Sequence, residues 1–164
     1  MSKAEPVKSI VTPTRLVYEF SAVGAHAEFL DNIARGRLIG RRCPGCSKVY
    51  VPARGNCPRC GIATAETVEV PGRGTVVTFC IVRVPSANID IKLPYAAAQI
   101  LLDGTDMAFH ALVQECDAED VRMGMRVEAV WAPKEEWGPT FENIRYFRPS
   151  GEPDVPFEQF KEFA

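Results

Sequence analysis

Two closely spaced cysteine pairs decide the fold: Cys43-Pro44-Gly45-Cys46 and, after ten intervening residues, Cys57-Pro58-Arg59-Cys60. A divalent ion that prefers tetrahedral coordination takes four thiolates, and two tight turns that each present two sulfur atoms supply them. The pattern therefore predicts one structural zinc ion bound by all four cysteines, with iron as the less favoured metal. Because the protein fills the coordination shell, no position remains for a hydrolytic water, and we expect the metal to stabilise the fold rather than to catalyse.

Short elements surround the cysteine pairs. Two β-like runs, residues 37–42 and 47–52, flank the first pair, so residues 37–62 are predicted to form a zinc ribbon. Upstream, Ala25 to Arg35 has the periodicity of a short helix. The apolar side of this helix is either a local lid on the neighbouring unit or a docking surface for a partner. Its apolar residues are Phe29, Leu30 and Ile33.

Downstream of the ribbon, turn signals separate five β-like runs, which predict a small closed barrel without exposed edges. The runs are Gly74 to Val84, Tyr95 to Leu102, Met107 to Val113, Met125 to Ala132 and Thr140 to Phe147. After them the tail has phenylalanines at helix-like spacing and either packs on the barrel or grips a partner. The chain is thus predicted to be mainly β. It divides into an N-terminal arm and helix (1–36), the zinc ribbon (37–62), the barrel (63–148) and the tail (149–164).

Composition is that of a globular protein. The 164 residues are 46% hydrophobic and 24% charged, enough for one ordinary domain or two very small ones. No apolar run approaches the roughly 18 residues of a membrane-spanning helix. The N-terminus has an acid and a proline and lacks the apolar core of a secretory signal. We therefore expect a cytoplasmic protein whose six cysteines are metal ligands or free thiols.

The charge is unevenly distributed. The formal net charge is -2, which does not by itself favour a polyanionic partner. Between Asp31 and Glu66, however, there is no acidic residue, and seven of the 19 basic residues fall there. Four thiolates and one divalent ion leave a local charge of about -2, so part of this basic excess compensates the metal centre. The remainder is a local positive surplus on an otherwise acidic chain.

Residue types for catalysis are sparse. Of the two histidines, His26 opens the helix and His110 lies in a strand pattern, where a hydrogen-bonded packing role is the expectation. Cys80 is predicted to be a buried thiol, and the acids beside Cys116 should raise its pKa rather than activate it. The sequence contains no nucleophile elbow, phosphate loop or dinucleotide fingerprint. A freestanding enzyme that uses His110 with a nearby carboxylate stays open as a rival interpretation.

Taken in order, these motifs resemble a known family. After the two cysteine pairs come Gly72-Arg73-Gly74-Thr75-Val76, Leu93-Pro94-Tyr95-Ala96, a strand that ends in Asp103-Gly104, and Gly124-Met125-Arg126-Val127. This order over residues 25–147 is similar to proteins in which a rubredoxin-like zinc ribbon joins a five-stranded OB-fold barrel. The family was catalogued as domain-of-unknown-function family thirty-five. The cysteine pairs alone would be generic, whereas their combination with the later motifs is specific.

The resemblance implies an accessory role in acyl-CoA metabolism. Family members pair with thiolase-like or aldol-cleaving enzymes in a hetero-oligomer, and the thiolase-like subunit holds the reactive groups. Some members have been proposed to bind CoA. A basic surface would suit the phosphates of CoA, and a tyrosine would suit its adenine. Metal compensation or a protein interface would explain the same residues. The candidate residues for CoA or an interface are Arg41, Arg42, Lys48, Tyr50, Arg54 and Arg59.

A different class of function, single-stranded nucleic-acid binding, is the main alternative. Zinc ribbons and OB barrels both occur in such proteins, and the basic segment would contact phosphates. The acidic barrel half and the low aromatic content, 9%, argue against a base-stacking surface. We therefore expect a non-catalytic accessory subunit of a thiolase-like enzyme, with neither a membrane nor a nucleic acid as its partner.

Overall fold

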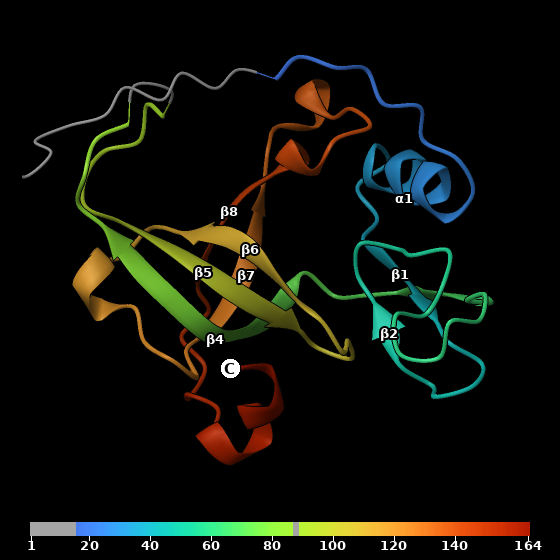
Figure 1. The fold of residues 1–164 in the computed structure, drawn as a ribbon. Helices are drawn as coiled ribbons and strands as arrows, with labels where there is room; N and C mark the ends of the chain where they lie inside the picture. The colour runs from blue at the N-terminus through green and yellow to red at the C-terminus, as the bar shows by residue number, and fades with distance from the viewer. Residues whose placement is uncertain (1–15, 87–88) are drawn as a thin grey trace, which may run out of the picture.

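The structure is a computed structural model that describes residues 16–86 and 89–164. A small zinc-ribbon sheet and helix α1 (Ala25–Ile33) lie on one side, and a barrel lies on the other (Figure 1). The ribbon sheet has the order β2-β1-β3, with β1 Ile39–Arg42, β2 Val49–Tyr50 and β3 Glu66–Glu69. The first residues of the predicted N-terminal arm, 1–15, lie outside the described residues.

The barrel is closed in the order β4-β5-β6-β8-β7. Its strands are β4 Arg73–Val82, β5 Tyr95–Leu102, β6 Ala108–Val113, β7 Arg126–Trp131 and β8 Ile144–Pro149. Short 3-10 turns connect or follow them: η1 Ala118–Asp120, η2 Lys134–Glu136, η3 Phe141–Asn143, η4 Phe157–Gln159 and η5 Lys161–Phe163. The predicted mainly β fold, with one helix, a zinc ribbon and a five-stranded barrel, is confirmed.

Alternation of side chains explains why the barrel strands form. Along β5 every second residue is buried, and Ala96, Ala98 and Ile100 point into the barrel. In β4 a bulge between Val76 and Thr78 shifts the register, and both Val76 and Val77 are fully buried. Val76, Ala96, Ala98 and Ile100 belong to one hydrophobic core that also includes side chains of α1 and of the ribbon.

Strand β3 was not predicted. Residues 66–69 pair antiparallel with β1, from Ile39 opposite Glu69 to Arg42 opposite Glu66. The strand is mostly exposed and carries a glutamate at each end, so its sequence has no apolar alternation to indicate a strand. The sequence division placed these residues with the barrel, whereas their backbone hydrogen bonds are with the ribbon.

Helix α1 packs on its own chain. Phe29 is 1% exposed and Ile33 is fully buried, and the Phe29 ring stacks on Phe141 at 5.4 Å between centroids. The buried side chain of Asn143 adds a hydrogen bond from Nδ2 to the carbonyl oxygen of Ile33, at 2.9 Å. The prediction that Phe29, Leu30 and Ile33 dock a partner is therefore wrong for Phe29 and Ile33, and Leu30 is partly buried against the same core. The helix is the local lid.

The turn between β5 and β6 holds the ribbon against the barrel. Asp106 accepts a hydrogen bond from the backbone N–H of Val49 at 2.8 Å and pairs with Lys48 Nζ at 2.7 Å. Its own N–H donates to the carbonyl oxygen of Val49, and Met107 packs beside the metal-binding cysteines. The ribbon and the barrel are thus joined by a polar clasp as well as by the shared core.

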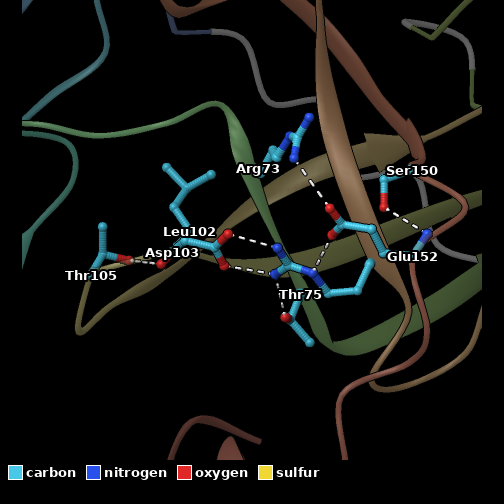
Figure 2. A network of polar contacts seen from close by, with 8 residues as sticks. Arg73, Thr75, Leu102, Asp103, Thr105, Ser150 and Glu152 are labelled. Carbon is cyan, nitrogen blue, oxygen red and sulfur yellow. Dashed lines mark hydrogen bonds and ion pairs between the residues drawn. The ribbon is translucent and has the colours of Figure 1, made fainter.

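The tail folds back onto the barrel, as the first of its two predicted alternatives had it. Arg126, 14% exposed, lies between Asp103 and Glu152, and Figure 2 shows Arg73 on the other side of Glu152. Further along the tail, Phe160 is 2% exposed, and the backbone passes so close to the barrel that only a glycine fits at residue 124. These contacts fix the tail at the foot of the barrel in Figure 1.

Candidate metal centre and its surroundings

The four predicted ligands meet at one point. The Sγ atoms of Cys43, Cys46, Cys57 and Cys60 all lie within 4.8 Å of one another. Cys46 Sγ and Cys57 Sγ are 3.6 Å apart, close to the edge of about 3.8 Å that four sulfur atoms at ~2.3 Å from a zinc ion would have. The backbone supports the same geometry, because the N–H of Gly45 donates to Cys43 Sγ and that of Cys60 donates to Cys57 Sγ, both at 3.3 Å. The donor set fits a structural zinc ion.

The surroundings of the sulfur atoms favour a thiolate at Cys57. Burial alone would raise the pKa of this thiol, but hydrogen bonds from the Tyr50 hydroxyl and from the backbone of Cys60 and Arg59 lower it to about 6. The hydrogen bond to Cys46, together with burial, raises the pKa of Cys60 to about 12. Four thiolates this close repel one another, and a divalent cation removes that repulsion. The chemistry of the site therefore calls for a cation.

Tyr50 is part of the metal centre. Its side chain is 5% exposed, and its hydroxyl lies 3.4 Å from Cys57 Sγ. This hydrogen bond and burial raise the pKa of Tyr50 well above its usual value. The suggestion that Tyr50 stacks on an adenine is not supported by this position, because the ring has no open face. Neither the residue type of Tyr50 nor its position in the sequence indicated that its hydroxyl contacts the sulfur atom of Cys57.

Three of the predicted basic residues are already paired with carboxylates. Arg41 binds Glu28 at 2.6 Å, Arg42 binds Glu66 at 2.9 Å, and Lys48 binds Asp106. Those acids come from α1, β3 and the β5–β6 turn, outside the acid-free stretch of sequence. The continuous basic surface expected from the sequence is therefore largely neutralised in the fold.

Arg54 and Arg59 are exposed and form no ion pair with any residue in the described ranges. Arg54 lines a hollow of about 420 Å³ between the ribbon loop and the start of α1. His26 and Asn56 also line it, and among the residues that the structure describes no acidic side chain does. The hollow thus has cationic and hydrogen-bonding side chains from two elements that are distant in sequence. The sequence pointed to Arg54 but gave no reason to group it with His26.

The remaining reactive residue types lie apart from the zinc ligands. Cys80 is exposed on the outer face of β4, so the prediction of a buried thiol is wrong. Burial, followed by the nearby Asp120 and Asp117, raises the pKa of Cys116, as the sequence predicted in direction. His110 lies on the exposed face of β6 with its Nε2 3.3 Å from Gln99 Nε2. These positions favour no nucleophile–base pair.

The residues on the outer face of the barrel test the alternative function, nucleic-acid binding. OB barrels bind oligonucleotides across their second and third strands, here β5 and β6. Two rows of residues face outward there, Cys80–Ala97–Leu112 and Thr78–Gln99–His110. Neither row contains an arginine, a lysine or a phenylalanine, tyrosine or tryptophan ring. These two rows lack the cations and the aromatic rings that stack on bases.

Comparison with known proteins identifies the family. The rubredoxin-like zinc ribbon domain of ChsH2 matches residues 32–64, and the C-terminal OB-fold domain of ChsH2 matches residues 67–132. A DUF35 domain-containing scaffold protein of Methanocaldococcus jannaschii is 38% identical over 102 residues, which are 62% of this chain and 72% of the relative. A protein of the same description from Pyrococcus furiosus is 33% identical over 94 residues, 57% of this chain and 68% of the relative. The chain belongs to the DUF35 family, as its motifs predicted.

A solved structure shares the fold. The structure described as the Ltp2-ChsH2(DUF35) aldolase superposes with a TM-score of 0.60 at 22% identity. The match covers 80% of this chain and 99% of that chain. It supports the arrangement of zinc ribbon and barrel described above. In the described part of the chain, none of the helices is long and apolar enough to cross a bilayer.

Proposed function

We propose that this chain is a non-catalytic subunit that binds and supports a thiolase-like enzyme, which forms or cleaves carbon–carbon bonds in acyl-CoA thioesters. The observation that carries the proposal is a metal site whose four ligands are all protein sulfur atoms, which suits a structural and not a catalytic ion. Further support comes from the relatives that are named scaffold proteins and from the solved structure that is described as the Ltp2-ChsH2(DUF35) aldolase.

The absence of a reactive pair in the described residues also supports this function. Neither His26 nor His110 hydrogen-bonds a carboxylate or a thiol within residues 16–86 and 89–164. The two outward rows across β4, β5 and β6, which contain no lysine, arginine or carboxylate, favour a protein partner over a nucleic acid. In a gel-shift assay with a single-stranded oligonucleotide at low salt, we accordingly expect no shift; a steep salt-dependent shift would restore the alternative.

Co-expression tests the proposal. The tagged chain is expressed with each thiolase-like protein encoded in the same genome, and complexes are separated by size-exclusion chromatography. We expect one stable complex that turns over acyl-CoA thioesters, whereas the purified chain alone has no activity. Activity of the isolated chain that is abolished by His110→Ala would contradict the proposal, as would the absence of a complex with every candidate.

A direct contact with CoA is the finer part of the proposal, and the hollow beside Arg54 is the best place for it. CoA carries a ribose phosphate and a pyrophosphate, and an unpaired arginine binds such groups through charge-assisted hydrogen bonds. Arg42 is the matched control, because it comes from the same basic segment but is paired with Glu66.

Calorimetric titration separates these residues. Arg54→Glu should weaken CoA binding by about tenfold or more, the equivalent of one charge-assisted bond, while Arg42→Glu should change it little. Dephospho-CoA should bind more weakly than CoA to the wild type if the ribose phosphate is the group that Arg54 contacts. Equal affinity of the wild type and Arg54→Glu would remove the hollow as the CoA site.

A further inference from the structure

The segment that precedes α1 exposes an unusual amount of apolar surface. Residues 16–23 contain five large apolar side chains, and each is 64% to 83% exposed. Elsewhere in the described chain, exposed large apolar residues are isolated from one another in the sequence, as on most soluble proteins. A continuous apolar segment in water is costly and typically marks an interaction site. The five residues are Leu16, Val17, Tyr18, Phe20 and Val23.

The order of these residues suits an extended conformation. The segment has neither helix nor strand in the structure. Along an extended chain, alternate side chains face the same way, so Leu16, Tyr18 and Phe20 share one face. Glu19 falls on the opposite face and leaves the three-residue row uncharged. Extended segments with this pattern bind proteins by placing alternate side chains in pockets.

Residues 16–23 join the rest of the protein next to the hollow that Arg54 lines. The Phe20 ring contacts the His26 ring, with centroids 5.0 Å apart, and His26 lines the hollow that contains Arg54. From there the chain runs above α1 (Figure 1, blue). A partner held by this segment would therefore lie beside the hollow proposed for CoA.

We infer that residues 16–23 are a docking arm for the thiolase-like subunit, which it grips in extended form with Leu16, Tyr18 and Phe20 as anchors in an apolar groove. This inference rests on the proposed function and adds to it the surface that makes the contact. A lipid surface suits the arm less well, because no lysine or arginine occurs between Leu16 and Val23. A second copy of the chain suits it less well too, because the mainly apolar hollow on β4 and β5 is about 220 Å³, too small for three large side chains.

The test compares two faces of the arm. One variant combines Leu16→Ser, Tyr18→Ser and Phe20→Ser, and the matched control combines Val17→Ser and Glu19→Ser on the opposite face. Affinity for the thiolase-like subunit found by co-expression is measured by calorimetry. Truncating one anchor at the centre of an interface typically weakens binding about 30-fold, so we expect the triple variant to bind more than ~100-fold more weakly. The control should stay within about threefold of the wild type, and both variants should keep their zinc and their thermal midpoint.

Each other outcome overturns the inference in a recognisable way. If the wild type and the triple variant bind the subunit equally, the arm is not the contact, although the proposed function stands. If the wild type binds no thiolase-like protein, the proposed function itself fails. Light scattering measures self-association of the chain, and flotation with phosphatidylcholine–phosphatidylserine vesicles measures binding to a lipid surface. Self-association or vesicle binding that the triple substitution abolishes would assign the arm to a second copy or to a lipid surface instead.

Discussion

Replacing Asn143 with leucine tests how α1 is fastened to the barrel. The Asn143 side chain is 1% exposed and makes three hydrogen bonds. Its Nδ2 donates to the carbonyl oxygens of Ile33 at 2.9 Å and of Gly138 at 2.8 Å, and its Oδ1 accepts from the N–H of Gly138 at 3.0 Å. Leucine keeps the branched shape and makes none of these bonds. The last turn of α1 would then lose its polar link to the loop before β8.

The size of the effect follows from these bonds. Each net hydrogen bond contributes about 1 kcal/mol, so the three predict a loss of about 3 kcal/mol in the free energy of unfolding. For a chain of this length 1 kcal/mol lowers the thermal midpoint by ~2–4 °C, which gives a fall of about 6–12 °C. Thermal unfolding of the zinc-loaded protein by calorimetry and circular dichroism measures it. Faster hydrogen exchange at the amides of residues 25–33 would show that the loss is at α1.

Asn32→Ala is the matched control. The Asn32 side chain donates to the carbonyl oxygen of Glu28 within the same helix, at 2.8 Å, and is only partly buried. Alanine is the better helix former, so this variant should unfold within about 0.5 kcal/mol of the wild type. If Asn143→Leu lowers the midpoint no more than Asn32→Ala does, the buried amide does not fasten the helix.

Three further predictions concern the charge, the tail and the metal. A hydrogen bond from Thr67, followed by those from Arg41, lowers the pKa of Glu28 despite partial burial. The charged carboxylate therefore stabilises the fold fully at pH values above its ordinary pKa of 4.5, and this stabilisation is lost as the pH falls through the lower pKa of the folded state. In urea titrations Glu28→Gln should therefore be less stable than the wild type at neutral pH and equal to it in strong acid; a constant difference would contradict this. A Cβ at residue 124 would lie 2.5 Å from a tail carbonyl oxygen, so Gly124→Val should speed proteolysis in residues 150–164 and leave the barrel intact, whereas an unchanged digest would show that the tail tolerates the substitution. Elemental analysis should find about one zinc per chain, retained in Cys80→Ser and lost in Cys46→Ser, and chelation should lower the thermal midpoint by ~10 °C or more; retention in both variants would reject the four-cysteine site.

The metal site was predictable because its signal is local. Four cysteines at fixed spacing specify both the ligands and the turns that hold them, and the structure brings all four together. The five barrel strands were predictable for a related reason, because the alternation of apolar and polar residues is a local feature of each strand's sequence. Cys80 shows the limit of that reasoning. The bulge after Val76 shifts the inward positions of β4, and a bulge leaves no trace in the pattern of apolar residues.

The basic residues could not be interpreted from the sequence alone. A run without acids looks like a cationic surface, but Glu28, Glu66 and Asp106 arrive from other elements and neutralise most of it. Such pairings depend on tertiary packing, which no local pattern reports. The same holds for Tyr50, whose contact with Cys57 depends on the fold of the ribbon. Arg54 and Arg59 have no ion-pair partner among the described residues, and Arg54 beside His26 forms a smaller and different candidate site.

The clasp at Asp106 has a consequence for exchanging parts between relatives. Strand β2, which follows the first cysteine pair, pairs with β1 and has a second hydrogen-bond partner, Asp106, in a turn that belongs to the barrel. A chimaera that joins the ribbon of one relative to the barrel of another must therefore transplant that turn together with the ribbon. A graft made only at the linker between the ribbon and the barrel would separate the Asp106 carboxylate from the Val49 N–H that donates to it. The ribbon and the barrel would then have to be engineered as a pair.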